Sequence, residues 1–182
     1  MGLWDKLRSR GSEAGGPEAE ARARFVWSRN MHLRVAAPEG DGWELLEAGP
    51  HGDGLVAAIR CMRGEPPNAL ALNAYAYSVT AEKRRTVEDL TKLDWRARAL
   101  GGTFRSVDTV RVETPTRPGI ETGCEVQIDG QGARDGNPLR VKERWVPSGA
   151  RLLVLTAAGS PELFDAYGRV VDVWLHTSSL GA

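Results

Sequence analysis

The sequence predicts an α+β domain, a largely antiparallel β-sheet with two amphipathic helices packed on it. Short alternating apolar runs, separated by turn residues, recur through most of the chain, as they do in antiparallel sheets. Two longer segments instead repeat their apolar residues every three or four positions, which is the helical period. The 182 residues are enough to bury a core without disulfide or metal staples.

Residues 1–24 differ in composition from the rest of the chain. Leu3, Trp4 and Leu7 share one helical face, and a small, charged, glycine-containing stretch follows them. This pattern is typical of a docking peptide on a flexible linker, which orders on contact with a partner, or of a frayed terminus whose Trp4 packs back on the domain. Residues 25–182 form a single predicted α+β domain.

The first strands are predicted before residue 80. The segments FVWS and MHLRVAAP are short strand candidates, and PEGDGW predicts a corner into a strand headed by Trp43. Residues 54–64 and 69–79 are apolar runs joined by the turn sequence EPPN, so they predict an antiparallel hairpin. Tyr75 and Tyr77 lie on one face of its second strand.

The first predicted helix spans TVEDLTKLDWRARALGG, residues 86–102. Thr86 and Asp89 are spaced as a capping pair, and two glycines provide the stop. Trp95 lies off the buried stripe of this helix. Four strands are predicted after it, at residues 104–113, 121–129, 139–146 and 151–157.

The second and third of these strands carry charges on alternate residues. An acidic row that includes Glu125 and Asp129 would face a basic row, Arg140 to Arg144, across the outer surface of a hairpin. We interpret these rows as cross-strand pairs that set the register, in preference to a phosphate site. The last predicted helix begins at Ser160 and Pro161, and its broad apolar stripe must lie on the sheet.

No catalytic or metal-binding motif is recognisable. The chain has no nucleophile elbow, no zinc-binding HExxH and no phosphate-binding loop, and its three histidines lack partners at a diagnostic spacing. Glu143 interrupts an inward-facing side of its strand, and buried carboxyl groups are sometimes functional. Cys61 and Cys124 are predicted to be buried, reduced thiols. We therefore expect no enzyme, no cofactor and no metal site.

The overall charge also limits the expected partners. The 24 basic and 24 acidic residues cancel, so neither nucleic acid nor an anionic membrane surface is an expected partner of the chain as a whole, and local charged patches are left open. No window approaches the roughly 18 apolar residues of a membrane span, so no stable membrane insertion is expected. The first residues lack a continuous apolar signal region and the myristoylation pattern, which predicts a cytoplasmic location.

Several segments together resemble a known superfamily. They are the corner at Pro38, Gly42 and Trp43, the helix that leads into a strand at TVEDLTKLDWRARALGGTF, the strand at 123–128, and LLVLTAAGSPE before the last helix. Their order resembles the PsbP-like α/β/α sandwich, although HTSSL stands where that family usually has Ser-Phe. The superfamily includes a photosystem subunit, a Ran-binding nuclear-import factor, DcrB-like bacterial proteins and Eag-type chaperones of type VI secretion. The resemblance implies a non-enzymatic module.

The predicted function is therefore an adaptor or chaperone of the bacterial cytoplasm, with secretion as one candidate pathway, that buries an apolar segment of a partner protein against an open sheet face or edge. Aromatic residues are enriched at interaction hot spots, and core packing is the alternative for each candidate. The candidate contacts are Leu3, Trp4, Leu7, Trp43, Tyr75, Tyr77 and Trp95. The alternative function is an enzyme or small-ligand-binding protein that uses a pocket between helix and sheet near Glu143. The oligomeric state is left open.

Overall fold

The computed structural model of the chain describes residues 22–51, 54–65, 68–78, 102–113 and 123–181. In chain order the elements are β1 (Ala23–Trp27), β2 (Leu33–Pro38), β3 (Trp43–Ala48), β4 (Leu55–Arg63), β5 (Leu70–Ser78), β6 (Phe104–Glu113), β7 (Cys124–Gly132), β8 (Pro138–Ser148), β9 (Arg151–Gly159), α4 (Pro161–Thr177) and β10 (Ser179–Leu180).

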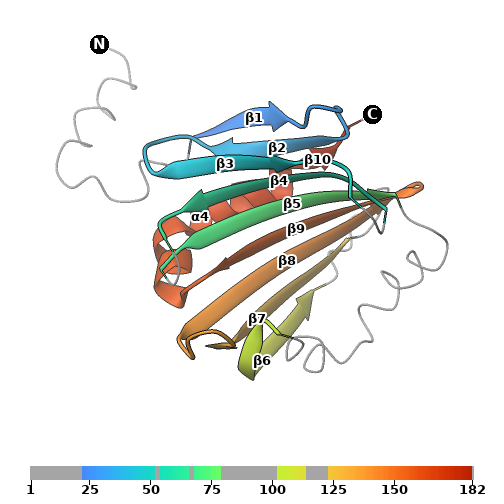
Figure 1. Cartoon of the computed structure of the whole chain (residues 1–182). Coiled ribbons are helices and arrows are strands. Elements are labelled where there is room, and N and C mark those ends of the chain that lie inside the picture. Colours follow the sequence, from blue (N-terminus) through green and yellow to red (C-terminus); the bar gives the residue numbers. More distant parts are fainter. Residues whose placement is uncertain (1–21, 52–53, 66–67, 79–101, 114–122, 182) are drawn as a thin grey trace, which may run out of the picture.

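The strands form two antiparallel sheets (Figure 1). The small sheet has the order β1-β2-β10, and the large one has the order β3-β4-β5-β9-β8-β7-β6. The helix α4 packs against β2 of the small sheet and against β5, β8 and β9 of the large sheet. The α+β class and the largely antiparallel sheet are thus confirmed.

The described residues contain one helix, α4, so they do not support the prediction of two. The other predicted helix, at 86–102, lies outside the described residues except for its last glycine, and Trp95 lies outside them with it. The same holds for Leu3, Trp4 and Leu7.

The segment PEGDGW turns the chain from the small sheet into the large one. Pro38 ends β2, and Gly40 and Gly42 have φ angles of 124° and 85°, a region that glycine enters without steric cost. Trp43 then begins β3 and meets Tyr167 of α4 edge-on, with ring centroids 6.1 Å apart. The predicted corner is confirmed, and Trp43 anchors its second strand.

The main core lies between the large sheet, β2 and α4. Leu33, Leu155 and Val171 are fully buried there, as is Trp174, whose indole Nε1 donates a hydrogen bond to the carbonyl of Asn73 at 3.3 Å. The predicted start of the last helix is confirmed, because Ser160 caps α4 by accepting a hydrogen bond from the amide of Leu163.

A second apolar cluster lies on the opposite face of the large sheet. Strand residues alternate between faces, so Leu152 and Val154 belong to this cluster while their neighbours in β9 belong to the main core. Tyr75 and Tyr77 are half-buried against the cluster, with their ring centroids 6.2 Å apart. This part of the sheet therefore packs apolar side chains on both faces.

Candidate functional site

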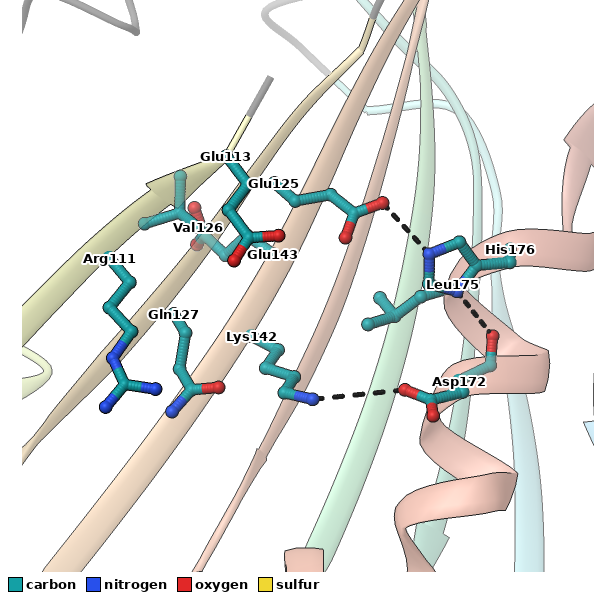
Figure 2. Close-up of a pocket in the computed structure, with 10 residues that line it drawn as sticks. All are labelled: Arg111, Glu113, Glu125, Val126, Gln127, Lys142, Glu143, Asp172, Leu175 and His176. Carbon is teal, nitrogen blue, oxygen red and sulfur yellow. Dashed lines mark hydrogen bonds and ion pairs between the residues drawn. The ribbon is translucent and has the colours of Figure 1, made fainter. Parts of the chain in front are cut away.

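A polar cleft opens between α4 and strands β6 to β8 (Figure 2). Its volume is about 130 Å³. The residues that line it are Arg111, Glu113, Glu125, Val126, Gln127, Lys142, Glu143, Asp172, Leu175 and His176. The cleft thus brings charges of both signs from three strands and one helix around one space.

The register of the sheet places a row of side chains across the cleft. Arg111 of β6 is paired with Gln127 of β7, and Gln127 is paired with Lys142 of β8. Paired residues on antiparallel strands have neighbouring side chains, so two cations flank one amide here. The next row along the strands has Glu113 paired with Glu125.

The helix joins the same strands through polar contacts. Lys142 Nζ lies 3.9 Å from Asp172 Oδ1, and Arg144 Nη1 donates to the carbonyl of Leu175 at 2.9 Å. The predicted pairing of an acidic row on β7 with a basic row on β8 is confirmed by the register. Their expected position on an outer surface is wrong, because α4 packs beside these rows and supplies its own polar groups to them.

His176 is held between two hydrogen-bond acceptors. Its Nε2 lies 3.0 Å from Glu125 Oε1, and its Nδ1 lies 2.8 Å from the carbonyl oxygen of Asp172. Both partner atoms are acceptors, so only the doubly protonated imidazolium donates to both, and a neutral ring satisfies one. This contact was not predicted from the sequence, because Glu125 and His176 are 51 residues apart.

Beside the cleft, the carboxylate of Asp129 accepts three side-chain hydrogen bonds. It accepts hydrogen bonds from Arg140 Nε at 2.5 Å, Gln127 Nε2 at 2.9 Å and Thr109 Oγ1 at 3.2 Å. Burial alone would raise the pKa of this carboxyl, but these hydrogen bonds and the charge of Arg140 outweigh it and lower the pKa below its usual value. Asp129 therefore stays ionised and fixes the β7–β8 register.

Glu143 lines the cleft, but its side chain lies on the opposite face of the sheet, with the second apolar cluster. Its register partner Val126 is part of the second apolar cluster, and paired residues share a face. There the Glu143 carboxylate accepts a hydrogen bond from Trp145 Nε1 at 3.0 Å. A pocket between helix and sheet therefore exists near Glu143, as predicted. The carboxyl group of Glu143 does not point into it.

Exposed apolar side chains are grouped at two other places, apart from the single Val112 on β6. Phe25, Trp27 and Met31 are 56%, 41% and 54% exposed on the β1–β2 hairpin, and Leu45 and Leu46 are 38% and 54% exposed on β3. Sequence reasoning missed all five. For the three residues of the hairpin, the available signal was the run RARFVWSRNMHLR, which contains four arginines, Phe25 and Trp27 and no acidic residue.

Both cysteines lie within the apolar clusters of the large sheet. Cys61 and Cys124 are free and buried, and burial raises the pKa of the Cys61 thiol to about 12 despite the charge of Arg24. Among the described residues, no three His, Cys, Asp or Glu side chains are grouped closely enough to hold a metal ion. Helix α4 does not have the length and apolar character needed to cross a membrane.

No family model matches the chain, and no curated protein matches it. Solved structures do match. LpqN, which is involved in cell envelope biogenesis of Mycobacterium tuberculosis, superposes with a TM-score of 0.53 at 11% identity, and the match covers 100% of this chain and 98% of LpqN. The PsbP protein of Synechocystis sp. PCC 6803 (CyanoP) gives a TM-score of 0.55 at 8% identity, over 88% of this chain and 93% of that one.

At such low identities the likeness concerns the fold alone. The narrower resemblance to DcrB-like proteins and Eag-type chaperones stays a prediction. What the two superpositions do establish is the architecture, and this chain has a PsbP-like fold.

Proposed function

We propose that the chain is a non-enzymatic protein-interaction module, an adaptor or chaperone of the cytoplasm, which binds an apolar segment of a partner protein along strand β3. The observation that carries the proposal is the position of β3 at the edge of the large sheet, where it pairs with β4 alone among the described strands. An edge strand offers unpaired backbone groups, to which an extended peptide can add as a further strand.

The side chains of β3 suit an extended apolar partner. Leu45 is paired with Cys61 of the main core, and Leu46 with Arg60, so the two leucines lie on opposite faces of the sheet. A peptide added beside β3 would cover both leucines with its own alternating side chains. Glu44 is exposed on the same strand, which favours a partner segment that carries a basic residue.

Substitution of the two leucines tests this proposal. A photoreactive residue placed at Glu44 should crosslink the partner in the parent chain. The crosslink should be lost in the variant Leu45→Ser/Leu46→Ser. The matched control is Val112→Ser, which removes an apolar side chain that is 37% exposed on β6, the opposite edge strand of the same sheet. Equal crosslinking by both variants would contradict the role of β3. A chain that lacks residues 1–24 separates the contribution of the Leu3–Trp4–Leu7 peptide.

A second candidate function is binding of a small polar ligand in the cleft. The observation that favours it is the row Arg111–Gln127–Lys142, which offers two cations and an amide to an anionic group. A thermal-shift screen of small carboxylates and phosphates tests it, with Arg111→Gln as the variant that should abolish any shift. A shift that persists in this variant would assign the binding to another place.

A further inference from the structure

The outer face of the β1–β2 hairpin combines exposed aromatic side chains with arginines. Val26 packs against the main core, so Phe25 and Trp27, its neighbours in β1, lie on the opposite, outer face. Arg34 of β2 is the register partner of Trp27, and its guanidinium carbon lies 4.4 Å from the Phe25 ring centroid and 5.8 Å from that of Trp27. We call Phe25, Trp27, Met31, Arg29 and Arg34 the hairpin surface.

The tip of the hairpin projects an apolar side chain. Met31 is 54% exposed and has a φ angle of 60°, a left-handed conformation that residues other than glycine rarely adopt. Two backbone hydrogen bonds hold the tip in place. The amide of Met31 donates to the carbonyl of Ser28, and the amide of Ser28 donates to the carbonyl of Leu33. The structure therefore holds an unfavourable backbone conformation at the place where a methionine meets solvent.

The charge of this segment selects the kind of partner. Residues 22–38 contain four arginines and no acidic residue. Arg29 at the tip is 92% exposed, although Glu47 of β3 lies 3.4 Å from its Nε. Arg34 is half-buried, and its Nε has no hydrogen-bond partner among the described residues. A second copy of the chain would bring the same arginines together, so a self-association through this face would be opposed by repulsion.

We propose that the hairpin surface binds the interface of an anionic lipid bilayer. Tryptophan favours the headgroup region, because its ring is apolar and its indole N–H can still reach water. Phenylalanine and methionine add apolar area that such a surface buries. Arginines reach lipid phosphates from the same depth, and each basic residue near an anionic surface strengthens binding about fivefold. Phe25, Trp27 and Met31 would enter the headgroup layer, and Arg29 and Arg34 would pair with phosphates. Arg29 contacts Glu47 of β3, but Phe25, Trp27 and Met31 belong to the β1–β2 hairpin. The inference uses neither leucine of β3, so it does not depend on the proposed function.

Vesicle flotation of the full chain tests the proposal. The chain should float with phosphatidylcholine vesicles that contain phosphatidylglycerol, and binding should weaken without the anionic lipid or at high salt. Arg29→Gln/Arg34→Gln should weaken it by one to two orders of magnitude, about fivefold for each arginine. Met31→Gly removes the apolar tip and relieves the strained backbone, so it should weaken binding without loss of thermal stability.

Matched controls separate this surface from the rest of the chain. Arg105→Gln removes an exposed arginine of β6, and Val112→Ser removes an exposed apolar side chain, so neither should change flotation. The proposal is overturned by hairpin variants that float like the parent, or by binding that is lost only in a Leu3→Ser/Trp4→Ser/Leu7→Ser variant. It is also overturned if the hairpin surface binds a single-stranded oligonucleotide and no vesicles.

Discussion

The contact between Asp129 and Arg140 should stabilise the folded chain by a measurable coupling energy. The two side chains are 21% and 25% exposed, and Arg140 Nε lies 2.5 Å from Asp129 Oδ1. Hydrogen bonds to charged groups contribute about 1.5–3 kcal/mol, whereas fully exposed ion pairs contribute about 0.2–1 kcal/mol. Since this pair retains some contact with solvent, we expect the lower end of the first range, about 1.5 kcal/mol.

A double-mutant cycle in urea measures that coupling, with Asp129→Asn, Arg140→Gln and the double variant. The Lys142–Asp172 pair is the matched comparison, because its atoms are 3.9 Å apart and Asp172 is 62% exposed. Its coupling should stay within the range of exposed pairs, about 0.2–1 kcal/mol. A coupling between Asp129 and Arg140 below about 1 kcal/mol would refute the reasoning, since the pair would then behave as an exposed one.

The same pair has a defined pH dependence. The pKa of Asp129 is lowered in the folded chain, so its ionised form stabilises the fold at pH values above the unfolded pKa of about 3.9. That stabilisation is lost as the pH falls through the folded-state pKa. Asp129→Asn cannot titrate, so its deficit in unfolding free energy relative to the parent should shrink below about pH 4. A deficit that is constant from neutral to acid pH would contradict the lowered pKa.

Three further predictions concern the core and the backbone. Trp174→Ala should lower the unfolding free energy by about 3–5 kcal/mol in urea titration, because it leaves a cavity where α4 packs on the sheet. Cys61 and Cys124 should resist iodoacetamide at mildly alkaline pH in the folded chain and react in urea, since burial raises both thiol pKa values; rapid labelling of the native protein would contradict this. Gly130→Ala should cost about 1–3 kcal/mol, because its Cβ would lie 2.2 Å from a backbone oxygen. Its matched control is Gly168→Ala in α4, which should be neutral or stabilising because the added Cβ would meet no neighbouring atom within 4 Å.

Periodicity predicted the elements of the fold well. The β4–β5 hairpin, the β7–β8 register and the capped start of α4 all depend on residues close together in the chain, and each is confirmed. The division into two sheets was not predicted. It depends on β2 pairing with β1 and β10 while β3 pairs with β4, and a turn such as PEGDGW does not disclose that its two strands belong to different sheets.

The candidate site was predicted only in part. Alternation placed the charges of β7 and β8 on one face, but the approach of α4 to that face, and with it His176, depends on contacts across 51 residues. The hairpin surface was missed for a related reason. Alternation assigns Phe25 and Trp27 to a common face, yet whether that face is covered depends on the rest of the fold.

The pairing of β10 with β2 joins residues that lie far apart in the chain. Ser178 Oγ accepts a hydrogen bond from the amide of Ala36, 142 residues away, and Ser179 and Leu180 continue as the third strand. Closing such a long loop is entropically costly, and folds rich in these contacts form slowly. Until residues 178–180 arrive, β2 has only β1 beside it in its sheet. A nascent chain would therefore expose the second edge of β2 until β10 has been synthesised. Molecular chaperones could bind this edge during that time.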